Sequence, residues 1–324
     1  MRNRPESDFT SSLSIEYKQS VRHYCNGLMN EMRRTLYLDT NLWNKLCEQS
    51  VIPEDLVTRL RARGWDVVFS PHLRYELART FRSIRPAATE KARLLFSYLE
   101  RFLSLHIPCV KQVPDLLREE VRHVCNETST IECFYQDGFY EREAAEIRKL
   151  AADNIDVGNN RVLDFRGKQV SEFREASPGR TAMWREHTEY DPQTTLEEFM
   201  EFGLREFGQR CLMKHVSQFF PDLADKQLRR IGRKLLSAPR YRLSQALVRG
   251  DIYLDWRCFH ERGIAKDTSD DCFHIENAAY CDAYATADAG QEKYANEILL
   301  KTRVRIYDRT KPPMEWLTSA AIAK

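Results

Sequence analysis

The sequence predicts an α/β protein in which a small parallel sheet is interrupted by a mostly α-helical insertion. Short apolar runs alternate with helical patterns near both ends of the chain, as in folds whose strands are joined by helices. The apolar runs are largely continuous, which is typical of strands that are buried on both faces. The middle of the chain carries helical patterns only.

The first α/β segment begins near residue 33. Pro53 lies in the first turn of an expected helix and Gly64 follows its end, whereas Pro71 opens the helix after the second strand. The elements expected here are a strand at 35–40, helices at 41–49 and 53–64, a strand at 65–71 and a helix at 71–83.

The central segment, from about residue 86, is expected to be helical, without a strand before residue 265. Its helices are predicted at 88–105, 113–126, 141–154, 194–220 and 225–236, with a polar, loop-rich stretch at 155–192.

The α/β pattern returns near the end of the chain. The elements expected there are a helix at 270–282, a strand at 283–288, a helix at 290–301 and a strand at 303–308. Without the middle of the chain, the two α/β segments together have the length of one compact domain. The predicted organisation is an N-terminal extension at 1–32, a discontinuous α/β domain at 33–82 and 251–312, a helical insertion at 83–250 and a C-terminal tail at 313–324.

Composition excludes few functions. The net charge is +2, from 50 basic and 48 acidic residues, so the chain as a whole does not indicate a nucleic-acid or membrane partner. Nine cysteines without a CxxC pair favour reduced thiols. No apolar run approaches the ~18 residues that cross a bilayer, and the polar start does not look like a signal peptide. We expect a cytoplasmic protein without a membrane partner.

Four carboxylates stand at positions that a parallel sheet brings to one edge. Asp39 and Asp288 end two of the expected strands. Glu76 lies in the helix after the second strand, and Asp271 begins a late helix. Because strand ends and helix starts line the ligand-binding edge of an α/β sheet, these acids are expected to converge on one cleft. Clustered carboxylates need a counter-charge, and oxygen ligands suit Mg²⁺ or Mn²⁺, ions that promote phosphodiester hydrolysis.

The acids also have purely structural interpretations. Asp39 could cap the helix that follows it, and Asp288 could begin a turn before Gly290. Glu76 could be a solvated helix residue that pairs with Arg79.

Four stretches carry a more specific signal. They are LYLDTN at 36–41, VVFSPHLRYELAR at 67–79, DCFHIENAAYCDAYATAD at 271–288 and VRIYD at 304–308. The third contains, in order, D-x-x-H, small residues, an acid and T-x-D. Together they resemble the PIN domain (PilT N-terminus type), a compact α/β fold of metal-dependent nucleases that includes the toxin ribonucleases of toxin–antitoxin pairs. The resemblance covers roughly a third of the chain.

The resemblance implies a nuclease in which a metal ion held by carboxylates activates water, with RNA favoured over DNA as substrate. By position, it implies metal ligands at Asp39, Glu76, Asp271 and Asp288, supported by Asn41, Asp282 and Thr286. The gap from Asp271 to Thr286 is about two residues shorter than in the family, so Asp270 is an alternative ligand.

Cations in two places are candidate phosphate contacts. Arg79 and Arg82 lie close in sequence to Glu76. The stretch 221–250 holds eight basic residues against two acidic ones. Its expected helix presents a basic face formed by Arg229, Arg230, Arg233 and Lys234. The alternative is a solvated helix that pairs with acids at 195–206, and the insertion could also bind a protein partner.

Other functions remain as alternatives. A PIN-like module with little turnover could be a nucleic-acid or protein binding platform, or the substrate could be DNA. An aspartyl-phosphate phosphatase is disfavoured because Asn41, and not an aspartate, stands two positions after Asp39. Zinc is disfavoured because Cys272 and His274 point about 200° apart on a helix. His274 is expected to be a packed or hydrogen-bonded core histidine.

Overall fold

A single all-parallel sheet lies at the centre of the computed structural model, with the strand order β2-β1-β3-β4. The strands are β1 (Arg34–Leu38), β2 (Trp65–Val68), β3 (Ala283–Thr286) and β4 (Arg303–Ile306). β1 pairs with β2 on one side and with β3 on the other, so the two ends of the chain share one sheet. The predicted α/β class with a small parallel sheet is confirmed. The structure describes residues 33–80, 86–136, 139, 141–145, 179, 182, 184, 186, 194–260, 268–319 and 322.

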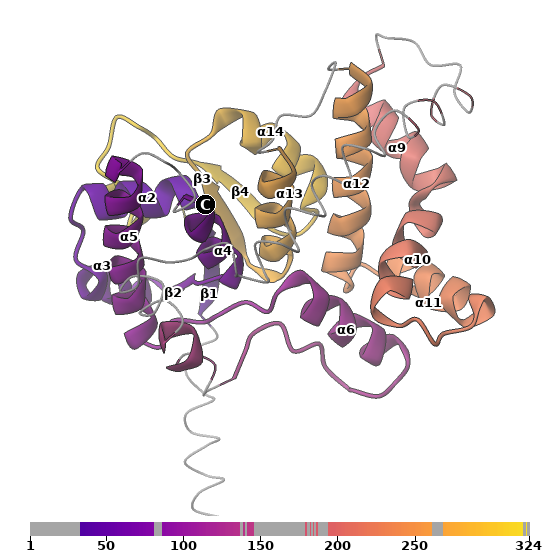
Figure 1. Cartoon of the computed structure of the whole chain (residues 1–324), viewed down its shortest axis with the longest axis horizontal. Helices are drawn as coiled ribbons and strands as arrows, with labels where there is room; N and C mark the ends of the chain where they lie inside the picture. Colours follow the sequence, from indigo (N-terminus) through magenta and orange to yellow (C-terminus); the bar gives the residue numbers. More distant parts are fainter. Residues whose placement is uncertain are drawn as a thin grey trace, which may run out of the picture.

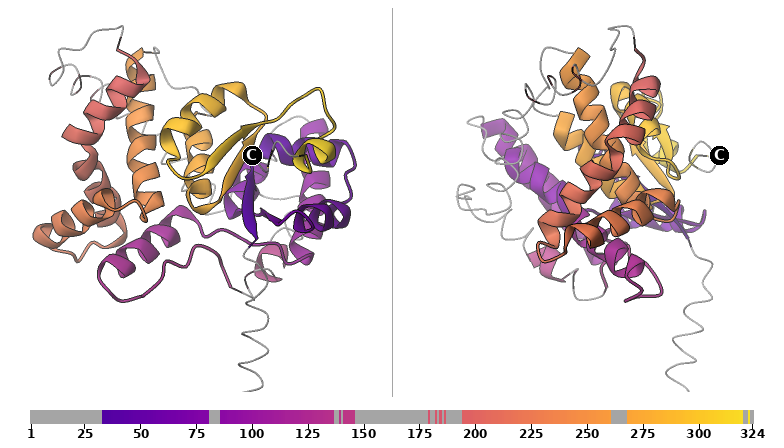
Figure 2. Two further views of the ribbon diagram at one scale, coloured as in Figure 1. Left: turned by 180° about the vertical axis from the view of Figure 1, so that it is seen from behind. Right: turned by 90° about the vertical axis from the view of Figure 1, so that its right-hand side faces the viewer.

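Each face of the sheet has its own hydrophobic core, because successive strand residues point to opposite faces. Leu36 and Leu38 enter one core, whereas Tyr37 enters the other. Helices cover both faces, as Figures 1 and 2 show. The first core is formed with α2 (Thr40–Glu48), α3 (Pro53–Arg61), α5 (Pro86–Ser104) and α15 (Pro313–Leu317). The second is formed with α6 (Val113–Val124), α9 (Leu196–Glu206), α10 (Gly208–Phe219), α11 (Asp225–Ser237), α12 (Arg242–His260), α13 (Thr268–Asn277) and α14 (Ala289–Ile298).

The boundaries of the early helices follow from local sequence. Pro53 begins α3, where a missing N–H is not needed for the helix. Gly64 has a φ of +74°, in the left-handed region, and turns the chain into β2. Pro71 begins α4 (Pro71–Thr80), which packs against both α5 and α13. Within the part of the chain that the structure describes, no helix combines the length and apolar character needed to cross a bilayer.

The single helix predicted at 194–220 is wrong, because the structure divides it into α9 and α10. The break falls at Phe207, whose ring packs edge-on against Trp184 with 4.7 Å between ring centroids. Gly208 follows, and glycine stabilises a helix poorly. The apolar periodicity continues across this point, so periodicity alone does not reveal the break.

Packing crosses the predicted boundary at residue 83. α5, the first helix after it, supplies Phe96 and Phe102 to the core that contains Leu36. An isolated β-bridge joins Phe69 to Cys109, so the segment predicted to be wholly helical also contains extended backbone. The division into domains stays a prediction. The extension at 1–32 and most of the predicted helix at 141–154 and loop at 155–192 lie outside the described residues.

Glu120 fixes the start of α12 against α6. Its side chain is fully buried and accepts hydrogen bonds from the backbone N–H groups of Leu243 and Ser244, at 2.9 and 3.0 Å. The hydroxyl of Tyr280 donates a further bond at 2.5 Å. Burial raises the pKa of Glu120 to about 7 in spite of these donors. The carboxyl group therefore joins three segments that lie far apart in sequence.

Glu120→Ala is expected to lower the free energy of unfolding by about 3 kcal/mol, because it leaves buried donors without an acceptor. Urea denaturation followed by circular dichroism measures the change. Glu197→Ala, at an exposed position of α9, is the control and should stay within about 0.5 kcal/mol of the wild type. Equal stabilities of the two variants would contradict the role given to Glu120.

Candidate functional site

The candidate site lies where β1 and β3 end. The chain passes from β1 outward to β2 and later enters β3 on the other side of β1. Such a switch point in a parallel sheet is where α/β proteins bind their ligands, beyond the carboxyl ends of the strands. Asp39 follows β1 and Thr286 ends β3, so both lie at this edge, named here the carboxyl edge.

Asp39 is buried and bonded through both of its carboxylate oxygens. Oδ1 accepts the N–H of Leu42 at 2.8 Å and thereby caps α2. Oδ2 accepts the Thr286 hydroxyl at 2.7 Å and the N–H of Ala287 at 3.3 Å. Burial raises the pKa of Asp39, although these donors work against it. Asp39 is thus a helix cap that also ties the end of β1 to the end of β3.

A hydrogen-bond chain connects Asp39 with Asp271. The Thr286 hydroxyl lies 2.6 Å from Gln291 Oε1 as well as 2.7 Å from Asp39 Oδ2. Gln291 Nε2 donates to Asp271 Oδ1 at 2.8 Å, and the Tyr294 hydroxyl donates to Oδ2 at 3.0 Å. Burial is the main reason that the pKa of Asp271 rises to about 6. Thr286 and Gln291, from β3 and α14, therefore set the relative position of the two acids.

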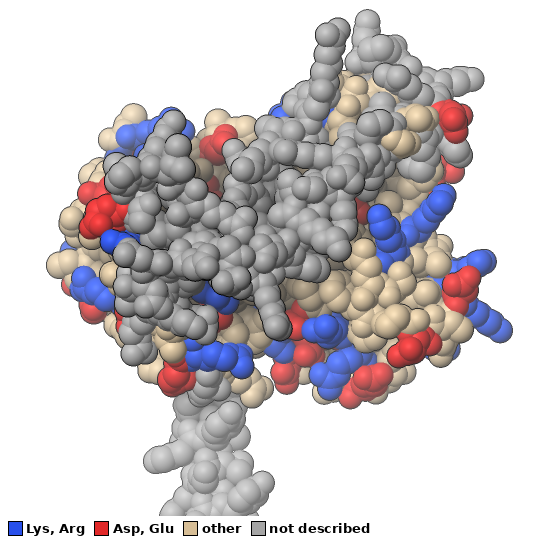
Figure 3. Space-filling model, viewed as in Figure 1, with Lys and Arg blue, Asp and Glu red and all other residues tan. Residues whose placement is uncertain are grey.

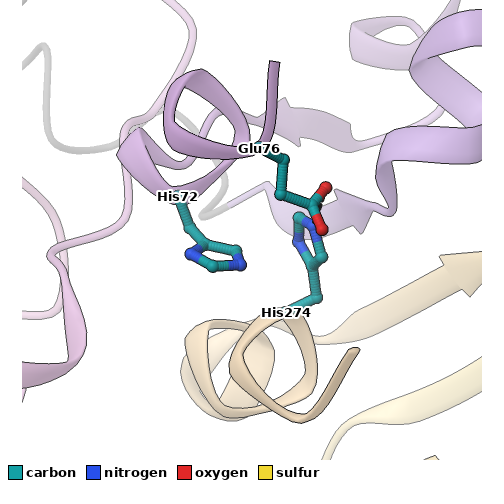
Figure 4. A group of neighbouring side chains, drawn as sticks. All are labelled: His72, Glu76 and His274. Atoms are coloured by element: carbon teal, nitrogen blue, oxygen red, sulfur yellow. Dashed lines mark ion pairs between the residues drawn. The ribbon is translucent and has the colours of Figure 1, made fainter. Parts of the chain in front are cut away.

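Glu76 and His274 meet across the interface of α4 and α13. Glu76 Oε2 lies 2.7 Å from His274 Nε2 and also accepts the Thr40 hydroxyl. The Tyr37 hydroxyl lies 2.8 Å from His274 Nδ1 and fixes the orientation of the ring. His72, one turn before Glu76 on α4, packs edge-on against His274 with 4.6 Å between ring centroids. Figure 4 shows the α4 side chains facing His274.

The electrostatics of the pair follow from burial and from opposite charges. Burial alone would raise the pKa of Glu76, but His274, His72 and Thr40 together lower it to about 2. Burial alone would lower the pKa of His274, but the carboxylates of Glu76, Asp39 and Asp271 outweigh it and raise the value. Three carboxylates at the carboxyl edge thus favour the protonated form of His274.

The other predicted ligands and supporting residues have different environments. Asp288 is exposed, and its Oδ1 caps α14 by accepting the N–H of Gly290 at 2.7 Å. Asn41 is exposed in the first turn of α2. Asp282 lies before β3, at the opposite edge of the sheet, where its Oδ2 accepts the N–H of Thr35 at 2.8 Å. None of these three belongs to the group around His274.

Several predicted residues lie outside the described part of the chain. Arg82 is one, and the side chains of Asp270 and Arg79 are not described although α13 and α4 include these positions. The choice between Asp270 and Asp271 as a ligand stays open for that reason. Asp271 has its place in the site through Gln291 and Tyr294.

The basic face predicted on α11 is exposed. Leu228, Ile231 and Leu235 are buried on the opposite face of this helix. Within the described residues, none of the four cations forms an ion pair, including with α9. Figures 1 and 3 show basic and acidic side chains interspersed where α10 and α11 lie, away from the carboxyl edge. The exposed cations are Arg229, Arg230, Arg233 and Lys234.

Sequence reasoning missed two parts of the site. His72 was not considered, although its spacing of four from Glu76 places both on one face of a helix. Arg309, after β4, is exposed and donates to the carbonyl oxygen of Ala287 at 2.8 Å. His274, expected to be a packed histidine, is buried and hydrogen-bonded, but it also faces the acids.

The arrangement offers ligands for a cation. One ligand atom from each of His72, Glu76 and His274 lies within 4.8 Å of the other two. The set combines two imidazole nitrogens with one carboxylate oxygen, whereas the prediction from sequence had oxygen ligands only. Imidazole suits Zn²⁺, Cu²⁺, Fe²⁺ and Ni²⁺, whereas carboxylate oxygens suit Mg²⁺ and Mn²⁺.

Comparison of the chain with protein-family models, with curated proteins and with solved structures finds no match. The functional argument therefore rests on the residues and contacts of this chain. The PIN-like identity stays a prediction from the sequence motifs.

Glu76→Gln is expected to lower the free energy of unfolding by about 2 kcal/mol at pH 5, because Gln keeps the shape of Glu but not its charge. A folded-state pKa of about 2 means that the stability supplied by the ionised group is lost as pH falls from about 4.5 toward 2. The difference between variant and wild type should therefore shrink to less than about half at pH 3. Urea denaturation at both pH values measures it, and a pH-independent difference would contradict the charge pairing.

Proposed function

We propose that the protein is a metal-dependent phosphodiester hydrolase of the PIN type, and that its substrate is RNA. The observation that carries the proposal is the gathering of three acids from the PIN-like motifs around His274. Each of Asp39, Glu76 and Asp271 acts on the charge of His274, and the group lies at the carboxyl edge of a parallel sheet. RNA is favoured over DNA by the resemblance of the motifs.

The donor set fits a divalent cation. His72, Glu76 and His274 would be the ligands of this cation. Asp39 and Asp271 would supply further negative charge nearby. Carboxylate oxygens suit Mg²⁺ and Mn²⁺, and the two imidazoles favour a transition-metal ion such as Mn²⁺ over Mg²⁺. When bound, such an ion would activate water and offset the charge of the phosphate. Asp288, exposed at the start of α14, is available on the same edge.

The residues of the chain keep the site in order. Thr286 and Gln291 hold Asp39 and Asp271 at a fixed separation through their hydrogen bonds. Tyr37 orients the ring of His274 so that Nε2 faces Glu76. Both effects reduce the reorganisation that catalysis would otherwise require.

Arg309 is the best placed cation for the substrate backbone. Its Nη2 is bonded to the carbonyl oxygen of Ala287, whose N–H donates to Asp39. Among the described residues no other hydrogen bond or ion pair of its guanidinium is found, so its remaining N–H groups can meet a phosphate. Arg309 would thus bind the RNA backbone close to Asp39, since only Ala287 lies between the two side chains. Arg79 and Arg82 stay candidates for the same role.

The second candidate is a nucleic-acid binding platform with little turnover. The exposed basic face of α11 favours it, because four cations on one helix face can follow a phosphate backbone without a catalytic site. The platform could also bind a protein partner through the helical segment. RNA binding without cleavage would indicate the platform, and cleavage would indicate the enzyme.

The wild type is expected to cleave end-labelled RNA in the presence of Mn²⁺, and Asp39→Asn to lose about 100-fold or more in rate. Asn is as good a helix cap as Asp, so α2 should persist, which circular dichroism checks. Single-stranded RNA, structured RNA and DNA are compared on one gel, which identifies the polymer.

Asp282→Asn is the matched control. It makes the same chemical change in the same sheet, but at the opposite edge, where Asp282 binds Thr35. We expect it to cleave within about threefold of the wild type, because it leaves the electrostatics of the carboxyl edge intact. Absence of cleavage by the folded wild type on every substrate, or equal loss in both variants, would contradict the proposed function.

Arg309→Gln is expected to raise KM for RNA about tenfold with little change in kcat, because it removes a phosphate contact and no metal ligand. The slope of log affinity against log salt should fall by about one. Arg303→Ala, at the amino end of the same segment, is the control. A loss confined to kcat would contradict a substrate-binding role.

A further inference from the structure

We propose that His72, Glu76 and His274 form a binding site for a transition-metal ion that selects Zn²⁺ over Mg²⁺. Two of its three members are histidines, which the ligand set predicted from the sequence does not include. It does not require cleavage of any substrate, so it can hold whether or not the protein is a nuclease.

The three side chains come from two helices that the fold holds together. His72 and Glu76 lie four residues apart on α4, which places both on one face of that helix. His274 faces them from α13, as Figure 4 shows. α4 and α13 pack against each other, so the group does not depend on a loop. A site built on packed helices keeps its ligands close to their binding positions.

The distances suit a small ion after a slight adjustment. Two ligand atoms that bind one tetrahedral ion at ~2.1 Å lie about 3.4 Å apart. The three ligand atoms lie within 4.8 Å of one another, which brackets this separation from above. Glu76 Oε2 and His274 Nε2 are closer, at 2.7 Å, because they bond to each other directly. A displacement of the Glu76 carboxylate by less than ~1 Å would widen this distance to that of two ligands on one ion.

The surroundings of His274 are those of a metal-bound histidine. Ligating imidazoles commonly use their second nitrogen in a hydrogen bond that fixes the ring. Tyr37 makes this contact at Nδ1, at 2.8 Å, and leaves Nε2 directed at Glu76. His72 is held by its packing against Phe273, with 5.9 Å between ring centroids. Both imidazoles are therefore oriented before an ion arrives.

The ligand types decide the selectivity. Mg²⁺ is a hard ion that prefers six oxygen ligands and keeps several waters. Zn²⁺ binds imidazole and carboxylate in a tetrahedral arrangement, and three protein ligands leave one position for water. His72 and His274 are almost fully buried, whereas the Glu76 side chain is 18% exposed. Solvent, and hence an ion, can reach the group from the side of Glu76.

The competing interpretation is an ion pair without a metal. Glu76 and His274 alone form that pair, and His72 would then act on Glu76 only through its charge and its packing. His72 is therefore the residue that separates the two. It is not needed for the Glu76–His274 contact, but it is needed as the third ligand.

The test measures metal binding by the full-length chain. Protein freed of metal with a chelator is titrated with Zn²⁺, Mn²⁺ and Mg²⁺ against a chromophoric competitor. Bound zinc per chain is counted by mass spectrometry of the eluted metal. His72→Phe keeps an aromatic ring at the packed position, and His274→Gln removes the second imidazole. His215→Ala is the matched control. Like His274, His215 pairs with a carboxylate, but its partner is Asp251 and the pair joins α10 and α12.

We expect Zn²⁺ to bind at least about tenfold more weakly in His72→Phe and in His274→Gln than in the wild type, with His215→Ala unchanged. Mg²⁺ at a large excess should not displace the zinc. Spectra with Co²⁺ should show coordination by nitrogen and oxygen without a thiolate charge-transfer band, which separates this site from binding by cysteines. Equal Zn²⁺ affinity in His72→Phe and His215→Ala would overturn the proposal, as would a thiolate band or displacement by Mg²⁺.

The outcome is distinguishable from that of the proposed function. Asp39→Asn, which changes none of the three ligands, should retain Zn²⁺ binding while it abolishes cleavage. Zinc binding that depends on His72, found in a protein that cleaves no substrate, would support the metal site and reject the nuclease.

Discussion

The contact between Glu76 and His274 joins two helices that are distant in sequence, and the rest of the carboxyl edge depends on it. A carboxylate or an imidazolium buried without its partner would cost several kcal/mol. Each group therefore needs the other, and Thr40 and Tyr37 complete their hydrogen bonds. Because α4 carries one partner and α13 the other, neither helix can shift without leaving a charge unpaired. The contact also holds His274 where Asp39 and Asp271, like Glu76, raise its pKa.

The acids of the site join elements of the fold through their hydrogen bonds. Asp39 caps α2 through one oxygen and reaches across to Thr286 through the other. Asp271 is held by Gln291 and Tyr294 of α14, and so the acid at the start of one helix is positioned by the next. A helix cap and a functional carboxylate were alternatives for Asp39 when only the sequence was considered. In the folded chain one oxygen caps α2 and the other binds Thr286, and a role of Asp39 in chemistry stays a proposal.

The sequence predicts the sheet and one edge of it well. Apolar runs bounded by Pro53, Gly64 and Pro71 locate the strands and helices within a few residues. The rule that strand ends share an edge brings Asp39, Glu76 and Asp271 together, although their role as ligands is a prediction.

Other features depend on contacts that periodicity does not contain. Asp282 matches the acid that comes before T-x-D in the motif, yet it precedes β3 and so lies at the other end of the strand. The partnership of His72 with His274 requires knowing that α4 packs on α13. The break at Phe207 depends on where Trp184 lies. Each of these features depends on a contact between residues that are distant in sequence. Local periodicity shows which face of a helix or strand is buried, but not what that face packs against.

The central pairing of β1 with β3 also has a consequence for synthesis of the chain. β1 leaves the ribosome before the helical segment, and its neighbour β3 follows only after that whole segment has been made. Until then one side of β1 has no strand to pair with, and such an open edge is prone to pair with other chains. The delay has a second effect: an incomplete chain carries Asp39 and Glu76 but neither His274 nor Thr286. The carboxyl edge can therefore assemble only after the helical segment, α13 and β3 have all been translated.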